Sequence, residues 1–268
     1  MEDNYTSSLA FDVKMGNMTM EDCDLLQYNG TYNETIHGVL CLEHAPTLTH
    51  SGMIRVWVLT GMALLSLFGN AATIFSIRRS RSRRLARHSW SAVYTLILHL
   101  SIADLLVTIF CIAGEAAWSY TVQWYAGNLA CKLYKFVQVF SLYLSTFVLV
   151  LIGVDRFLAV RYPMQSLSTM RRCQRLLIAA WLLSFILSTP QLAIFHVSKG
   201  PFWEDFHQCV THGFYSEQWQ EQLYTSLSLV TMFILPLLVL VCTYVSTIIT
   251  IAIIIANLEM DEKSTQKP

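Results

Sequence analysis

The chain has 268 residues, of which 54% are hydrophobic and only 13% are charged, whereas an average soluble domain has roughly 25% charged residues. Its formal net charge is zero, but residues 1–51 hold eight acidic side chains and one basic one, and residues 78–90 hold six arginines and no acid. This composition excludes an ordinary soluble domain and favours a membrane protein whose charged loops set its orientation.

Five apolar segments are each long enough to cross a bilayer as a helix, which takes about 20 residues. They predict helices at about 54–77, 91–114, 129–158, 174–196 and 223–256. The last is longer than a bilayer requires, so it should tilt or project beyond the membrane. The sequence therefore predicts an all-α membrane protein with an N-terminal segment at 1–51, a helical bundle at 52–256 and a polar tail at 257–268.

The arginines determine the expected orientation. Basic residues collect in cytoplasmic loops, which places 78–90 and the loop after the third helix inside the cell. The N-terminal segment is then outside, and it carries N-x-S/T sequons at Asn4, Asn17, Asn29 and Asn33 that predict glycosylation. Its acidic, polar start is unlike a cleavable signal peptide, so the first helix should act as signal and anchor. We expect a multi-pass protein of the plasma membrane.

The seven cysteines fit this orientation. Cys131 is expected at the outer end of the third helix, and Cys209 in the outer loop between the fourth and fifth helices. The oxidising exterior favours a disulfide between them. Cys23 and Cys41, in the N-terminal segment, are candidates for a second bridge.

An amide lies inside the first apolar segment, Asn70, and an acid inside the second, Asp104. A charged group in hydrocarbon costs about 2.5–3.5 kcal/mol on insertion scales, so Asp104 needs a partner or a purpose. One interpretation is a hydrated polar cluster that holds a cation. The other is hydrogen bonding between helices that only stabilises their packing. The residues alone leave both open.

A second polar group is predicted nearer the outer surface. Glu115 lies 11 residues beyond Asp104, which in a regular helix is a rise of about 16 Å and a return to within about 20° of the same face. Trp118 follows near that face, and Gln138 lies five turns from Arg156 on the third helix. The functional interpretation is a pocket open to the outside. The alternative is a solvated Glu115 and a Trp118 that belongs to an interfacial aromatic belt.

Other functions find little support in the sequence. It contains no metalloprotease, serine hydrolase, Walker A or dinucleotide-binding motif and no zinc-type Cys/His spacing. A transporter would be expected to show inverted repeats or broken helices, and neither is evident. We therefore expect no enzyme activity and no nucleic-acid partner, since the arginine-rich loop is explained as a topology signal.

One ordered set of motifs resembles the rhodopsin-like G-protein-coupled receptors. The set is "GN" (Gly69, Asn70), "LSIAD" ending in Asp104, Cys131, "DRF" at 155–157, Trp181, Pro190, Cys209, Pro236 and Tyr244. The stretches "TVQWYAGNLACKL" and "QCVTH" are similar to the gonadotropin-releasing hormone receptor superfamily. The stretches "LYLSTFVLVLIGVDRFLAVRYPM", "GPFWEDFHQCVTHGFY" and "WQEQLYT" are most similar to its insect corazonin receptors. The resemblance covers about residues 46–250.

The resemblance implies roles for the outer residues. Cys131 and Cys209 would form the family's extracellular bridge. Glu115 and Trp118 stand where relatives contact a peptide hormone, although the usual acid there is aspartate. Gln138 stands where vertebrate relatives have a lysine. The implied ligand is an amidated peptide with a blocked N-terminus.

The resemblance also implies roles deeper in the bundle. Asp104 with Asn70 would form a sodium-sensitive polar core, although vertebrate relatives often lack this acid. Arg156, held by Asp155 and with Tyr244 as a possible neighbour, would be the switch that meets a heterotrimeric G protein.

The family has seven helices, and five are predicted here. We therefore expect a truncated form of a corazonin or gonadotropin-releasing hormone-like neuropeptide receptor. An alternative is a non-signalling chain that dimerises with the full-length receptor and down-regulates it. Exposed helix faces, otherwise covered by membrane lipid, would favour such oligomers. A truncated chain could also be retained in the endoplasmic reticulum.

Overall fold

The computed structural model describes residues 44–84, 92–161 and 170–265. The chain divides into two compact units, Met1–Pro46 with Lys199–Phe206, and Thr47–Ser198 with His207–Pro268. The larger unit contains the long helices and the candidate site. The sequons at Asn4, Asn17, Asn29 and Asn33, the Cys23 and Cys41 pair and part of the arginine-rich loop lie outside the described residues.

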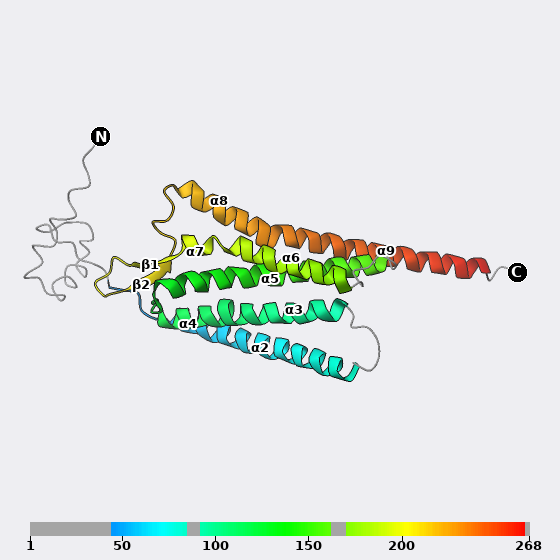
Figure 1. The fold of residues 1–268 in the computed structure, drawn as a ribbon, viewed down its shortest axis with the longest axis horizontal. Coiled ribbons are helices and arrows are strands. Elements are labelled where there is room, and N and C mark those ends of the chain that lie inside the picture. The colour runs from blue at the N-terminus through cyan, green and yellow to red at the C-terminus, as the bar shows by residue number, and fades with distance from the viewer. Residues whose placement is uncertain (1–43, 85–91, 162–169, 266–268) are drawn as a thin grey trace, which may run out of the picture. The chain divides into compact units, whose positions relative to one another are not determined.

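Five helices in the described residues are long and apolar enough to cross a membrane, and Figure 1 shows them packed side by side. This confirms the predicted all-α bundle. In chain order the helical segments are α2 (His50–Arg84); α3 (Ala92–Val107), η1 (Thr108–Ala113) and α4 (Gly114–Thr121); α5 (Gly127–Arg161); α6 (Met170–Ser188) and α7 (Gln191–Ile194); α8 (Gln218–Leu229), η2 (Val230–Ile234) and α9 (Leu235–Thr265).

Several helix boundaries differ from the sequence expectation: the first and second long helices, for example, end at Arg84 and Thr121 instead of 77 and 114. The fourth long helix does not run unbroken to residue 196: α6 ends at Ser188, because Pro190 has no N–H and disfavours helical geometry in the residue before it. After the short α7, strand β1 (His196–Lys199) begins and pairs with β2 (His207–Val210). At the other end of the chain, α9 continues past Ala256 to Thr265, so most of the expected tail extends the helix.

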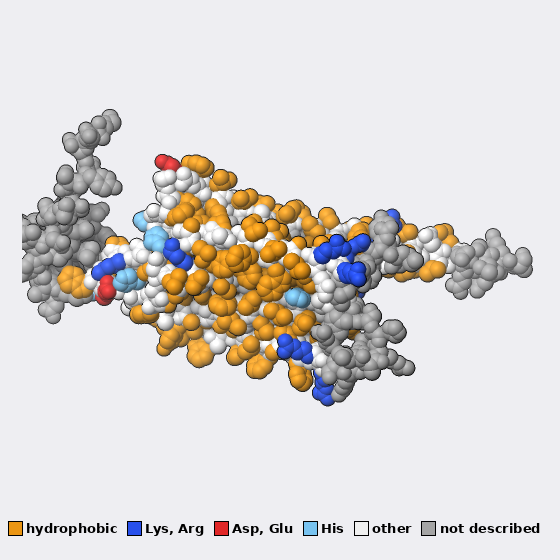
Figure 2. Space-filling model, viewed as in Figure 1, with side chains coloured by type: hydrophobic (Ala, Val, Ile, Leu, Met, Phe, Trp, Pro, Cys, Tyr) orange, Lys and Arg blue, Asp and Glu red, His pale blue; other side chains and the backbone are white. Residues whose placement is uncertain are grey.

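Helix α5 is the centre of the larger unit and contacts α3, α6, α7 and α9. A buried apolar cluster joins α3, α5 and α6: Ala92, Leu96, Ala103, Leu144, Val148, Cys173 and Leu177. Gly153 lets α9 approach closely, because a Cβ there would lie 2.9 Å from a methyl group of Leu240. Figure 2 shows a broad apolar surface over the middle of the helices. Such a surface suits helices whose outer faces are covered by lipid.

Two π-helical segments, η1 and η2, interrupt the long helices. A π-turn is wider than an α-turn and often marks a functional region. Segment η2 lies just before Pro236, whose missing N–H and bulky ring disturb the preceding turn. Segment η1 separates Asp104 from Glu115. The alignment predicted for these two residues from regular helix geometry therefore does not hold, because a wide turn rotates the chain less per residue.

In the smaller unit, the carboxylate of Glu204 holds the chain at residues 44 and 45. Nδ1 of His44 lies 2.7 Å from Oε1, and the backbone N–H of Ala45 donates to Oε2 at 2.7 Å. These hydrogen bonds, that of His44 above all, lower the pKa of Glu204 from 4.5 to about 2. Beside this contact, Lys199 pairs with Asp205 at 2.9 Å.

Glu204→Gln should loosen this contact, because the amide keeps one acceptor oxygen and loses the charge. The folded-state pKa lies below 4.5, so the ionised carboxylate stabilises the contact above that pH, and this contribution is lost as the pH falls toward about 2. We expect faster hydrogen exchange at the Ala45 amide in E204Q at neutral pH, measured by mass spectrometry. Asp205→Asn is the matched control. Equal protection of Ala45 in E204Q and the unaltered chain would contradict this assignment.

Candidate binding pocket

The structure joins Cys131, near the start of α5, to Cys209 on β2 by a disulfide whose Cα atoms lie 5.7 Å apart. Both residues are buried, and the predicted pair is confirmed. The bond links residues 78 positions apart. A crosslink over so long a loop typically stabilises a fold by about 2–4 kcal/mol, mainly by restricting the unfolded chain. In the folded protein it holds β2 against the end of α5.

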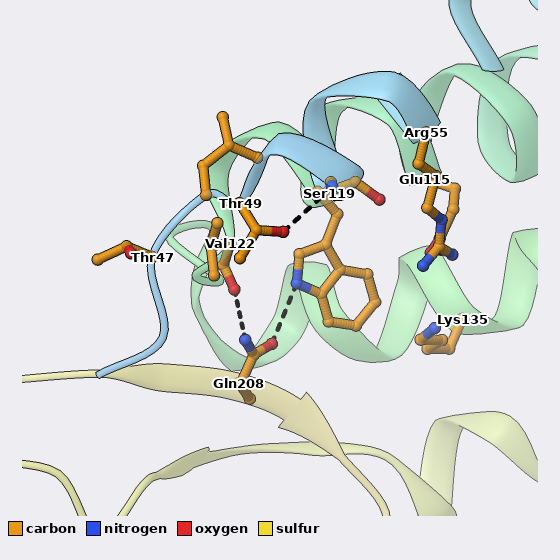
Figure 3. Close-up of a pocket in the computed structure, with 11 residues that line it drawn as sticks. Thr47, Thr49, Arg55, Glu115, Ser119, Val122, Lys135 and Gln208 are labelled. Atoms are coloured by element: carbon orange, nitrogen blue, oxygen red, sulfur yellow. Dashed lines mark hydrogen bonds and ion pairs between the residues drawn. The ribbon is translucent and has the colours of Figure 1, made fainter. Parts of the chain in front are cut away.

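Gln208, the neighbour of Cys209, connects β2 to the second long helix. Its Nε2 donates to the carbonyl of Val122 at 2.5 Å, and its Oε1 accepts from Nε1 of Trp118 at 3.0 Å (Figure 3). Val122 has φ 61°, a backbone conformation that β-branched residues rarely adopt. The bond from Gln208 helps to fix this turn. The disulfide, the side chain of Gln208 and the turn at Val122 together set the orientation of Trp118.

A pocket of about 530 Å³ lies among these residues. Its volume is within the range of sites that bind small ligands or single groups of larger ones. Two predicted ligand residues, Glu115 and Trp118, line it. Among the residues that the structure describes, the lining comes from α2 and the segment before it, α4, the turn after α4, α5 and β2: Thr47, Leu48, Thr49, Gly52, Arg55, Glu115, Trp118, Ser119, Val122, Lys135 and Gln208.

Gln138, the third predicted ligand residue, is not among those that line the pocket. Its Nε2 donates to the carbonyl of Phe110 and to the hydroxyl of Tyr134, each at 3.4 Å. Its Oε1 accepts from Nζ of Lys135 at 3.3 Å. Gln138 thus contacts η1 and supports the residues one turn closer to the pocket. Binding of ligand by all three residues stays a prediction.

Trp118, which lines the pocket, belongs to an aromatic cluster. The rings of Trp118, Trp124 and Tyr134 have centroids 5.3, 6.3 and 5.5 Å apart, within the usual range for favourable ring contacts. Gly114 makes room for it, because a Cβ at this position would lie 2.5 Å from the Tyr134 hydroxyl oxygen.

Three charged side chains from the described segments line the pocket. Arg55 on α2 forms an ion pair with Glu115 at 2.6 Å, and Nζ of Lys135 lies 4.5 Å from the centroid of the Trp118 ring. Figure 3 shows Arg55 beside Glu115, with Lys135 on the neighbouring helix. Neither cation is predicted from the sequence. For Lys135 a signal existed, since it is three residues from Gln138 and hence on a similar face of the helix.

The predicted polar core is connected through hydroxyl groups. Asn70 donates to the carbonyl of Ser66 at 3.0 Å, and the hydroxyls of Ser66 and Thr108 lie 2.6 Å apart. The hydroxyl of Thr108 donates to the backbone carbonyl of Asp104. The hydroxyl of Ser145 donates to the side-chain carboxylate of Asp104 at 2.5 Å. Oxygen donors of this kind suit a hard cation, but the same bonds also stabilise helix packing. Sodium binding near Asp104 stays a prediction.

At the opposite end of α5, Asp155 and Arg156 form an ion pair. The Asp155 side chain is 3% exposed and that of Arg156 is 46% exposed. Tyr244 on α9 is half exposed. Within the described residues, no hydrogen bond joins it to Arg156. The structure therefore shows Asp155 holding Arg156, and the role of these residues in contacting a G protein stays a prediction.

Comparisons with known proteins agree with this arrangement. The profile of the 7 transmembrane receptor (rhodopsin family) matches residues 69–267. The gonadotropin-releasing hormone II receptor of Clarias gariepinus is 34% identical over 239 residues, covering 88% of this chain and 62% of that receptor. The gonadotropin-releasing hormone receptor of Octopus vulgaris is 38% identical over 229 residues, with 85% and 54% covered. That of Sus scrofa is 34% identical, with 86% and 73% covered.

The chain therefore belongs to the rhodopsin family of seven-transmembrane receptors, and within it to the receptors that resemble those for gonadotropin-releasing hormone. It is a multi-pass membrane protein of a family of signalling receptors, which agrees with the expectation that it is not an enzyme. The chain spans 62% and 54% of the length of the first two relatives named above.

Gly114→Ala should distort the aromatic cluster of Trp118, Trp124 and Tyr134, because the new methyl group would overlap Tyr134. Overpacking of this kind typically costs about 1–3 kcal/mol. We expect a lower melting temperature for the detergent-solubilised protein. Gly61→Ala is the matched control, since no atom lies within 4 Å of a Cβ built there and alanine favours a helix. Equal melting temperatures for G114A and G61A would show that Gly114 is not needed for packing.

Proposed function

We propose that this chain is the ligand-binding region of a receptor for a peptide hormone of the corazonin and gonadotropin-releasing hormone type. We propose also that this receptor activates a heterotrimeric G protein. The observation that carries the proposal is the pocket lined by Glu115 and Trp118 and held in place by the bridge from Cys131 to Cys209. In this proposal the pocket and the sequons of the N-terminal segment face the outside of the cell.

The pocket chemistry suits one end of a peptide. Trp118 lines the pocket and offers its ring to an apolar or aromatic side chain, while Trp124 and Tyr134 pack against that ring. Arg55 and Glu115 provide donors and acceptors for backbone amides, because each keeps hydrogen-bonding capacity beyond the contact that joins them. Aromatic anchors with a few polar groups are typical of specific recognition sites.

The continuous helix α5 supports a route from pocket to cytoplasm. It carries Lys135 at the pocket and, near its other end, Arg156 paired with Asp155. A peptide that shifted the pocket end of α5 would displace the whole helix, since an uninterrupted helix transmits movement along its axis. Displacement of Arg156 would then change the surface offered to a G protein.

The choice of corazonin-type peptides rests on the resemblance of the stretches "GPFWEDFHQCVTHGFY" and "WQEQLYT" to insect corazonin receptors. The relatives reported above carry the name of gonadotropin-releasing hormone receptors, so peptides of both types belong in the test.

Membranes from cells that express the chain should bind a labelled amidated peptide of one of these types saturably, and unlabelled peptide should compete. Glu115→Gln should weaken binding at least tenfold (about 1.4 kcal/mol), because it removes the charge that holds Arg55. Glu221→Gln, a carboxylate of α8 that does not line the pocket, is the matched control.

Failure of every corazonin-type and gonadotropin-releasing hormone-type peptide to bind saturably would contradict the proposed function. Saturable binding that E115Q leaves unchanged would retain the peptide receptor and place its ligand outside this pocket.

A further inference from the structure

Lys135 is a cation with an unusual environment for a group at the wall of an open pocket. Its Nζ lies 4.5, 5.3 and 5.7 Å from the ring centroids of Trp118, Phe195 and Tyr134. The side chain is partly buried. Ring faces attract an ammonium group by their quadrupole, so these three rings hold Nζ at the pocket wall.

The hydrogen-bonding capacity of Lys135 is largely unused. An ammonium group has three N–H donors and no acceptor. Within the described part of the chain, Nζ donates to Oε1 of Gln138 at 3.3 Å, and no carboxylate lies within ion-pairing distance of it. Ring faces attract the charge but do not replace oxygen acceptors. At least one donor is therefore left for an acceptor that enters the pocket.

The other two charged groups of the pocket, unlike Lys135, form an ion pair. Glu115, the acid of the pocket, is engaged by Arg55 at 2.6 Å. With Arg55 and Glu115 neutralising one another, the three charged groups that line the pocket in the described part of the chain leave one positive charge, that of Lys135. A partly desolvated cation favours an oxygen acceptor more strongly than an exposed one does, because water competes less for it.

We infer that Lys135 is a ligand-binding residue: its ammonium group donates a hydrogen bond to a carbonyl or carboxylate oxygen of the bound peptide. This inference rests on the proposed function and adds to it the residue that recognises the peptide. The rings of Trp118, Phe195 and Tyr134 position the cation, and Gln138 holds it from the turn below. Recognition of the peptide thus depends on Lys135, a residue that is not predicted as a ligand contact from the sequence.

The test compares three variants in the peptide-binding assay described above, with surface level and melting temperature measured alongside. Lys135→Met keeps the length of the side chain and removes its charge and donors. Lys135→Arg keeps both. Lys132→Met is the matched control, because Lys132 lies on the same helix and does not line the pocket. We expect K135M to weaken peptide binding at least tenfold, K135R to stay within about threefold of the unaltered chain, and K132M to bind as the unaltered chain does.

Two outcomes overturn the inference while leaving the proposed function intact. One is K135M binding the peptide as tightly as the unaltered chain. The other is an equal loss in K132M, which would show that net charge alone matters. A loss in K135R as large as that in K135M, at unchanged melting temperature, would also overturn the inference. Arginine keeps the positive charge and the N–H donors that the inference requires. If the unaltered chain binds no peptide, the proposed function fails, and this inference fails with it.

Discussion

The disulfide between Cys131 and Cys209 is the constraint on which the pocket depends. It anchors β2 to the end of α5, and the residue next to it, Gln208, then reaches the turn after α4 and the indole of Trp118. Two helices and a hairpin thereby meet around one side chain. Without the covalent anchor, a two-stranded hairpin would be marginally stable by itself, and Gln208 would have no fixed position from which to orient Trp118.

A second constraint is the cost of polar groups inside the apolar bundle. The polar side chains of the interior are joined to each other or to helix carbonyls, as the links from Asn70 through Ser66 and Thr108 to Asp104 illustrate. At the cytoplasmic end predicted from the arginines, Asp155 is buried and satisfied by Arg156. Helix α5 connects these layers, because it packs against most of the other long helices. The fold therefore places one rigid helix between the pocket and the Arg156 end.

Much of this arrangement could be predicted from the sequence. The five spans follow from apolar runs of sufficient length, and the bridge follows from two cysteines on the same expected side of the membrane. Glu115 and Trp118 line one pocket, as the sequence predicts, and their binding of ligand stays a prediction. These successes share a cause: each depends on spacing along one segment or on the side of the membrane, both of which a sequence records directly.

The remainder depends on contacts between segments. Arg55 belongs to the pocket only because α2 packs against α4, and Lys135 only because the rings of Trp118 and Phe195 converge on it. The wide turn η1 changes the rotation of Glu115 relative to Asp104. The residues of η1 include no proline or glycine from which this turn could be predicted. Gln138, chosen by helical register, supports Lys135 instead of lining the pocket.

The most direct measurement of the central claim is peptide affinity after removal of the bridge. In a variant with both Cys131→Ser and Cys209→Ser, labelled peptide should bind at least tenfold more weakly than to the unaltered chain at equal surface level, because Trp118 loses its fixed orientation. Cys242→Ser, which changes a cysteine on the exposed surface of α9, should leave affinity unchanged. Unaltered affinity in the double variant would contradict the account, since the pocket would then form without the constraint that is held to build it.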